Sequence, residues 1–208
     1  MIRLMRYLVD SENLPILYDT PVSEEMLAND FEIKGGKWYV EDGWLVGENR
    51  QNSAAMVMSK DEYLGDVMVE FDAATILPAT RDINVTFHGS WDDEKNRRDI
   101  AYVFGVEGWY QGYVGFEKSP KYDLVINTKL LNFEPGKVYH IQAGNIGSNL
   151  FFVVDGTLAL EIRDPDPIDV NKYGRVGFEA FCTKVKYKNI KVKRVEPIED
   201  FSLYTPEF

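Results

Sequence analysis

The chain has 208 residues, of which 45% are hydrophobic and 13% aromatic, a content that excludes a predominantly disordered protein. Its formal net charge is −11 and it holds one cysteine, so the sequence predicts no nucleic-acid partner and excludes an internal disulfide. A chain of this length suits one β-sandwich with a single core, and we expect one domain over residues 1–208.

The sequence predicts no signal peptide in the N-terminal region. Residues 1–10 contain two arginines and a broken apolar stretch, without the continuous apolar segment of a signal peptide. No stretch reaches the roughly 20 apolar residues of a membrane span. The sequence therefore predicts a cytoplasmic protein with no membrane partner. A short helical turn follows at 23–28, where Ser23 is suited to cap the first turn.

Most of the remaining chain has the pattern of β-strands. Apolar and polar side chains alternate over residues 66–75, 82–90, 138–146, 157–162 and 187–195. A period of two with one apolar face is typical of half-buried antiparallel strands. Because helical patterns are nearly absent, the sequence predicts an all-β fold in which two antiparallel sheets pack face to face.

Turn residues separate these strands. Asp42-Gly43 and Asp155-Gly156 each stand between two apolar runs, which is the strongest short-range signal for a β-hairpin. The pair Pro135-Gly136 predicts a type II turn. We expect a jelly-roll core over about residues 15–195, followed by a C-terminal tail that lies on the surface.

Four segments resemble, in chain order, the concanavalin A-like lectin/glucanase superfamily. Residues 38–45 are similar to its W-x-V-x-D-G-x-L start and 67–72 to the long strand that follows; 138–156 resemble its strand–turn–strand ending in V-D-G, and 174–192 its G-x-I-G-F and Y-x-N-I-x-V ending. Within that superfamily the chain looks most similar to 3-keto-glucoside (3-keto-disaccharide) hydrolase-like and YesU-type domains. The resemblance implies a concanavalin A-like jelly roll with a carbohydrate ligand in a concave-sheet cleft.

Strand alternation nominates side chains for that cleft. They are residues opposite the core positions, because one face of the concave sheet is open. Sugars suit a surface of aromatic rings, which stack on C–H groups, and of polar groups, which bond to hydroxyls. We predict His88 and Glu179 as acid/base residues, and a substrate-binding set of Asn84, Trp91, Tyr102, Trp109, Tyr113 and Glu117.

Three functions remain open from these residues. The first is a carbohydrate-active domain that binds a mono- or oligosaccharide and acts as a glycoside hydrolase or lyase. The second is a non-catalytic, lectin-like module that uses the same cleft, and the third is a structural or protein-interaction sandwich. Paired titratable groups with perturbed pKa values in a pocket would favour the enzyme.

The sequence predicts no cofactor, with calcium as an open alternative. The acidic loops at 91–94 and 164–169 offer oxygen ligands of the kind that calcium prefers, whereas one cysteine and two separated histidines give no zinc spacing. Residues 184–194 concentrate basic side chains. We interpret them as lysines that protect an edge strand from aggregation, with contact to an anionic sugar as the alternative. The oligomeric state is not predicted.

Overall fold

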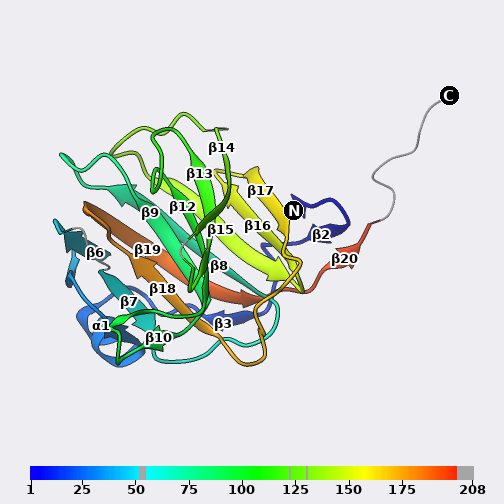
Figure 1. Ribbon diagram of the computed structural model, residues 1–208, viewed down its shortest axis with the longest axis horizontal. Helices are drawn as coiled ribbons and strands as arrows, with labels where there is room; N and C mark the ends of the chain where they lie inside the picture. Colours follow the sequence, from blue (N-terminus) through cyan, green and yellow to red (C-terminus); the bar gives the residue numbers. More distant parts are fainter. Residues whose placement is uncertain (52–54, 122, 130, 201–208) are drawn as a thin grey trace.

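Two antiparallel sheets stack face to face in the computed structural model, which describes residues 1–51, 55–121, 123–129 and 131–200 (Figure 1). The first sheet has seven strands, in spatial order β14 (Asp123–Thr128), β13 (Val114–Ser119), β12 (Ala101–Val106), β9 (Ile83–Gly89), β18 (Arg175–Glu179), β7 (Met56–Ser59) and β4 (Phe31–Ile33). The second has β17 (Thr157–Arg163), β16 (Asn149–Val154), β15 (Tyr139–Ile146), β8 (Val67–Thr75), β19 (Thr183–Arg194), β6 (Trp44–Asn49) and β5 (Lys37–Glu41), with β3 (Ile16–Tyr18) paired to β19 as its eighth strand. The predicted all-β sandwich of two antiparallel sheets is confirmed.

The core lies between the two sheets and is rich in aromatic rings. Phe71 of β8 meets Phe178 of β18 edge to face at 5.2 Å between ring centroids. Phe104 of β12 stacks on Phe152 of β16 at 5.0 Å. Each of these residues is at most 1% exposed, and each belongs to one continuous apolar cluster. Edge-to-face and stacked pairs of this kind add to the area that the rings bury, so they fix how the sheets face one another.

Glycine-containing turns set the register of the hairpins. Asp42 and Gly43 join β5 to β6 with φ values of 51° and 72°, and Asp155 and Gly156 join β16 to β17 with 48° and 75°. Two consecutive residues with positive φ match the twist of the flanking strands. Both predicted hairpins are confirmed. A short turn also joins β15 to β16, and there Gly147 alone has a positive φ, of 54°.

One helix covers an end of the sandwich. Helix α1 (Glu24–Asp30) begins after Ser23, whose hydroxyl accepts a hydrogen bond of 3.0 Å from the backbone N–H of Met26. The helix buries Met26 and Leu27 against the core. The predicted Ser23 cap is confirmed, because its hydroxyl satisfies one N–H group left unpaired at the start of the helix.

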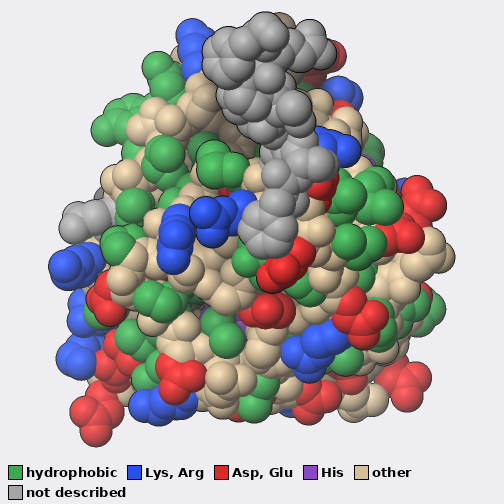
Figure 2. All heavy atoms as spheres, turned by 90° about the vertical axis from the view of Figure 1, so that its right-hand side faces the viewer, with side chains coloured by type: hydrophobic (Ala, Val, Ile, Leu, Met, Phe, Trp, Pro, Cys, Tyr) green, Lys and Arg blue, Asp and Glu red, His purple; other side chains and the backbone are tan. Residues whose placement is uncertain are grey.

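The N-terminal segment forms a small sheet that sequence patterns did not reveal. Strands β1 (Ile2–Arg3), β2 (Tyr7–Val9) and β20 (Ile198–Glu199) pair beside β16 and β17 (Figure 1). Residues of this sheet and its loops pack with Met68 and Phe151 in a second apolar cluster. On this side of the molecule, basic and acidic side chains are interspersed (Figure 2). The predicted C-terminal tail falls partly in residues 201–208, which lie outside the described residues.

The basic strand β19 is central in its sheet. It pairs with β8 on one side and β6 on the other, so the interpretation that its lysines protect an edge strand is wrong. Lys186 and Lys188 project from the outer face, where each ammonium lies 4.4 Å from the ring centroid of Trp44.

Among the described residues, no helix is long and apolar enough to cross a membrane.

Candidate functional site

A hairpin covers part of the outer face of the seven-stranded sheet. Strands β10 (Trp91–Asp92) and β11 (Arg97–Arg98) pair with each other, and Arg98 of β11 contacts Glu179 of β18. Lys34 anchors this hairpin to the end of β4, because its ammonium lies 2.8 Å from a carboxylate oxygen of Asp93 and 5.9 Å from the ring centroid of Trp91. The hairpin thus carries Arg98 over the sheet.

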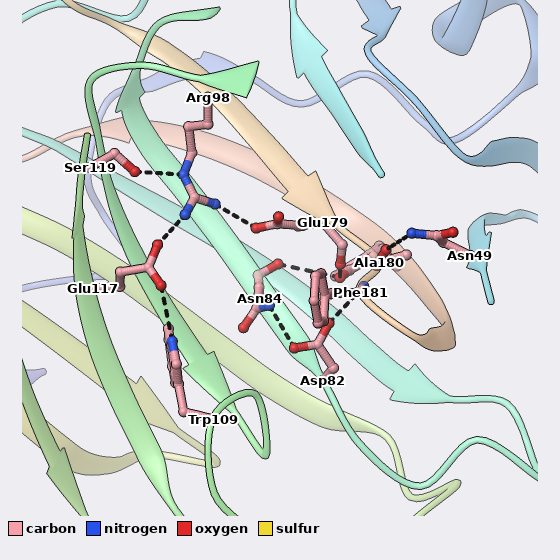
Figure 3. Close-up of polar contacts among 11 residues, drawn as sticks. Asn49, Asp82, Asn84, Arg98, Trp109, Glu117, Ser119, Glu179, Ala180 and Phe181 are labelled. Atoms are coloured by element: carbon pink, nitrogen blue, oxygen red, sulfur yellow. Dashed lines mark hydrogen bonds and ion pairs between the residues drawn. The ribbon is translucent and has the colours of Figure 1, made fainter. Parts of the chain in front are cut away.

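Arg98 joins two buried carboxylates on that outer face (Figure 3). One guanidinium nitrogen lies 2.5 Å from Oε2 of Glu179, and another forms an ion pair with Oε1 of Glu117. Its Nε donates to the hydroxyl of Ser119 at 2.8 Å. Charge-assisted contacts of a planar guanidinium fix geometry as well as charge. We call Arg98, Glu117, Glu179 and Ser119 the Arg98 cluster; one cation and two carboxylates leave it with an excess of negative charge.

The indole of Trp109 extends this cluster toward solvent. Its Nε1 donates to Oε2 of Glu117 at 3.0 Å. Its ring lies against two glycines that face each other across β12 and β13, Gly105 and Gly115. A Cβ atom would lie 3.1 Å from the ring at Gly105, which is a tight contact, and 2.5 Å from it at Gly115, which is closer than packed side chains approach. The absence of side chains at these two glycines therefore leaves the space that the indole occupies.

A buried carboxyl group, Asp82, lies beside the cluster (Figure 3). Its two oxygens accept hydrogen bonds of 2.8 Å from Nδ2 of Asn84 and from the backbone N–H of Phe181. Burial, reinforced by the negative charge of Glu179, raises the pKa of Asp82 to about 8. Asp82 is therefore mostly protonated at neutral pH. Oδ1 of Asn84 and the hydroxyl of Thr86 are buried without a hydrogen-bond partner among the described residues.

A cleft of about 750 Å³ opens beside Trp109. Its lining includes Arg81, Glu107, Trp109, Tyr110, Lys129 and Phe133. Glu107 accepts a hydrogen bond of 2.6 Å from the backbone N–H of Gly112, and burial raises the pKa of its carboxyl. Volumes of this order hold small ligands. Trp109 thus connects the Arg98 cluster to an accessible cleft.

The structure brings four of the predicted site residues together: Asn84, Trp109, Glu117 and Glu179 share the outer face of the seven-stranded sheet. The ring of Tyr113 lies edge-on, at 6.1 Å between centroids, to the ring of Tyr110, which lines the cleft. Trp91 lies in the covering hairpin, and its indole N–H is buried without a partner among the described residues.

Tyr102 does not face the cleft. Its ring belongs to the core and lies 5.7 Å from the rings of both Phe87 and Phe116. Its hydroxyl donates to Asp164 at 3.0 Å and accepts from the N–H of Ile168 at 2.7 Å. The prediction of a stacking platform is wrong, because the inward positions of β12 begin at Tyr102.

His88 is also directed away from Glu179. Its φ of 48° breaks the alternation of β9, and its imidazole reaches the opposite sheet. Nε2 lies 2.8 Å from Oδ1 of Asn145, and Nδ1 lies 2.9 Å from the carbonyl oxygen of Tyr173. Burial lowers the pKa of His88, against the opposing effect of these two acceptors. The prediction that His88 acts in the cleft is wrong, since its buried ring is directed to the opposite sheet and away from Glu179.

Sequence reasoning missed Arg98, Asp82 and Arg81. Arg98 acts from a hairpin, and Asp82 stands just before β9, where alternation does not apply. The available signal was the pair Gly105 and Gly115, since glycine inside a strand often marks a close approach by another group.

Neither acidic loop forms a metal centre among the described residues, where no three His, Cys, Asp or Glu side chains gather around one point. Asp164 instead contacts Tyr102 and the ammonium of Lys118, the latter at 2.8 Å. Asp92 pairs with Lys95 at 2.6 Å. Calcium binding stays a prediction.

Comparison with solved structures identifies the fold. No protein-family model matches the chain, and neither does any curated protein sequence. The carbohydrate-binding module CBM66 from Bacillus subtilis superposes with a TM-score of 0.65 at 17% identity, over 79% of this chain and 97% of that one. A Bacillus subtilis protein of unknown function with a galectin-like fold gives 0.68 at 16% identity, over 91% and 98%. A candidate glycosyl hydrolase from Parabacteroides distasonis gives 0.57 at 15%, over 86% and 100%. The chain is a jelly-roll sandwich of the concanavalin A-like type.

Proposed function

We propose that this protein binds a carbohydrate in the cleft beside Trp109. The observation that carries the proposal is the seating of the indole. Glu117 holds its N–H, and two facing glycines hold its ring. An aromatic ring fixed in this way presents an apolar surface at little cost in side-chain entropy. The pyranose or furanose C–H face of a sugar is a matching ligand.

The polar lining suits sugar hydroxyl groups. Glu107, Gln111 and Asn132 line the cleft around the indole and offer carboxyl and amide groups. A ligand in a cleft needs a few such groups among apolar ones to fix its orientation. The likeness of the fold to the carbohydrate-binding module CBM66 supports this proposal. A carbohydrate ligand is common to both alternatives, the non-catalytic lectin-like module and the enzyme.

A second candidate function, glycoside hydrolysis, is favoured by one observation. The pKa of Asp82 is raised to about 8, and the carboxylate of Glu179 is one cause of that shift. A protonated carboxyl near an ionised one is the arrangement that serves general acid catalysis. In this proposal Asp82 is the proton donor and Glu179 its charged neighbour. The resemblance to 3-keto-glucoside hydrolase-like and YesU-type domains supports it.

Binding can be tested by thermal unfolding against a panel of oligosaccharides. A sugar at 100 times its dissociation constant stabilises the folded state by about 2.7 kcal/mol. For a chain of this size the melting temperature rises by roughly 5–10 °C. We expect Trp109→Ala to abolish the shift and Trp44→Ala, a half-buried tryptophan on the opposite sheet, to preserve it. Absence of any shift with millimolar sugars would refute carbohydrate binding.

Hydrolysis needs a separate measurement. Release of reducing ends from each bound sugar is followed with the native protein and with Asp82→Asn. We expect the substitution to leave binding in place and to abolish turnover, since an amide cannot donate the acid proton. Binding without turnover in the native protein would leave the non-catalytic module as the function.

A further inference from the structure

Two basic side chains line the Trp109 cleft. Arg81 and Lys129 both lie in its wall. Neither forms an ion pair with a carboxylate in the described part of the chain. The protein as a whole is acidic, with 34 acidic and 23 basic side chains. In such a chain a basic group usually finds a nearby carboxylate, as Lys137 does with Asp155 at 3.0 Å.

The carboxyl groups nearest these cations do not cancel them. Glu107 is the one carboxyl in the described lining, so the cations outnumber it even when it is ionised. Its Oε1 accepts the N–H of Gly112, and burial raises its pKa, which further favours the neutral form. Asp82, the neighbour of Arg81 in sequence, is mostly neutral at pH 7 because its pKa is about 8. The described lining of the cleft therefore carries more positive than negative charge.

The Arg98 cluster has the opposite sign and contacts the indole through Glu117. Its two carboxylates exceed its one guanidinium, and one of them holds Trp109. Within the cleft, Glu107, Gln111 and Asn132 offer oxygen acceptors that suit hydroxyl donors. Arg81 and Lys129 offer cationic donors, which suit an anion. This polarity fits a sugar that carries hydroxyl groups and one acidic substituent.

We propose that the ligand of the Trp109 cleft is a carboxylated sugar, such as a uronic acid residue, with its carboxylate directed to Arg81 and Lys129. The inference rests on the proposed carbohydrate binding and specifies the substrate class of that same site. A guanidinium and a carboxylate match as planar, bidentate partners, and the ammonium of Lys129 adds a second charge. The net charge of −11 opposes approach at long range, so the selectivity depends on these two side chains.

The test compares acidic oligosaccharides with their neutral counterparts. Isothermal titration at pH 7 uses oligogalacturonide, oligoglucuronide and oligomannuronide, each beside the same oligomer with its carboxyl groups reduced to alcohols. We expect at least one acidic form to bind about tenfold more tightly than its reduced form. The difference should shrink between 50 and 300 mM salt, because exposed charges are screened.

Matched variants locate the charge selectivity. Arg81→Gln and Lys129→Gln are each expected to weaken binding of the acidic oligomer about tenfold and to leave the reduced oligomer unaffected. Lys186→Gln and Lys188→Gln remove the same charge from the opposite sheet and should change neither affinity. Melting temperatures of all four variants establish that they fold.

Each outcome distinguishes the two proposals. Equal affinity for acidic and reduced oligomers, lost in Trp109→Ala, would overturn the carboxylate inference and leave carbohydrate binding intact. An acidic preference that disappears in Lys186→Gln or Lys188→Gln, but not in Arg81→Gln or Lys129→Gln, would also overturn it. No binding of any oligomer would refute both proposals.

Discussion

Replacement of Asp82 by asparagine should flatten the pH dependence of stability. The carboxyl is 2% exposed, and its pKa rises from 3.8 to about 8 on folding. Between these values the folded protein holds a proton that the unfolded chain releases. The contribution of Asp82 to the free energy of unfolding is therefore complete below about pH 4 and declines as pH rises toward 8. Asparagine has no proton to lose.

The magnitude follows from the size of the shift. One pKa unit corresponds to about 1.4 kcal/mol, so the free energy of unfolding falls by at most about 1.4 kcal/mol for each pH unit. Across the interval from 3.8 to about 8, the upper limit is roughly 6 kcal/mol. Because the side chain is almost completely buried, screening by solvent does not reduce this limit. The stability of Asp82→Asn relative to the native protein should rise steadily with pH.

Urea unfolding at pH 5, 6, 7 and 8, followed by tryptophan fluorescence, measures that difference directly. Asp42→Asn is the matched control, because Asp42 also has a positive φ but lies in an exposed hairpin turn. Native and Asp82→Asn curves that run parallel, with a difference that changes by less than about 0.5 kcal/mol over this range, would refute the raised pKa. They would also remove the basis for Asp82 as a general acid.

Three further substitutions test the geometry of the site. Arg98→Met leaves two buried carboxylates without their cation, so it should lower the free energy of unfolding in urea titrations by about 3–5 kcal/mol. A loss of stability below about 1 kcal/mol would contradict the two ion pairs. Gly115→Ala places a Cβ 2.5 Å from the Trp109 ring, so it should shift the tryptophan emission and weaken sugar binding. Unchanged affinity for sugar would contradict the packing of the indole against this glycine. His88→Ala should lower the free energy of unfolding by about 2 kcal/mol or more, while the folded variant binds sugar with unchanged affinity. A loss of affinity without a loss of stability would show that His88 contributes to the binding site.

The fold followed from local patterns because its strands are regular. In β18, Val176 and Phe178 point into the core, as alternation predicts, and this places Glu179 on the outer face. The Asp-Gly pairs fixed two hairpins through positive φ values that few other residues adopt without strain. Strand alternation and turn residues are local patterns that extend over two to ten residues, so they can be recognised in a single sequence.

The contacts that build the candidate site act over longer distances. Arg98 is separated by 19 residues from Glu117 and by 81 from Glu179. Trp109 and Glu117 were nominated one by one as sugar contacts, without any indication that they bond to each other. The link between them depends on Gly105 and Gly115, which become neighbours only when β12 pairs with β13. Pairing of distant strands is therefore the information that residue patterns lacked.

Backbone conformation explains the remaining error at β9. Alternation holds only while every residue keeps an extended backbone with negative φ. Asp82 and His88 flank the strand's alternating positions with φ values of 76° and 48°, a region that Asp and His enter more readily than bulky residues do. At His88 the change directs the imidazole to Asn145 of the other sheet, while Asp82 contacts Asn84 and lies within the field of Glu179. In the proposed hydrolase function, Asp82 takes the acid/base role that the sequence predicts for His88, six residues later. The pH dependence of the stability of Asp82→Asn tests the raised pKa on which that proposal depends, and the release of reducing ends tests turnover itself.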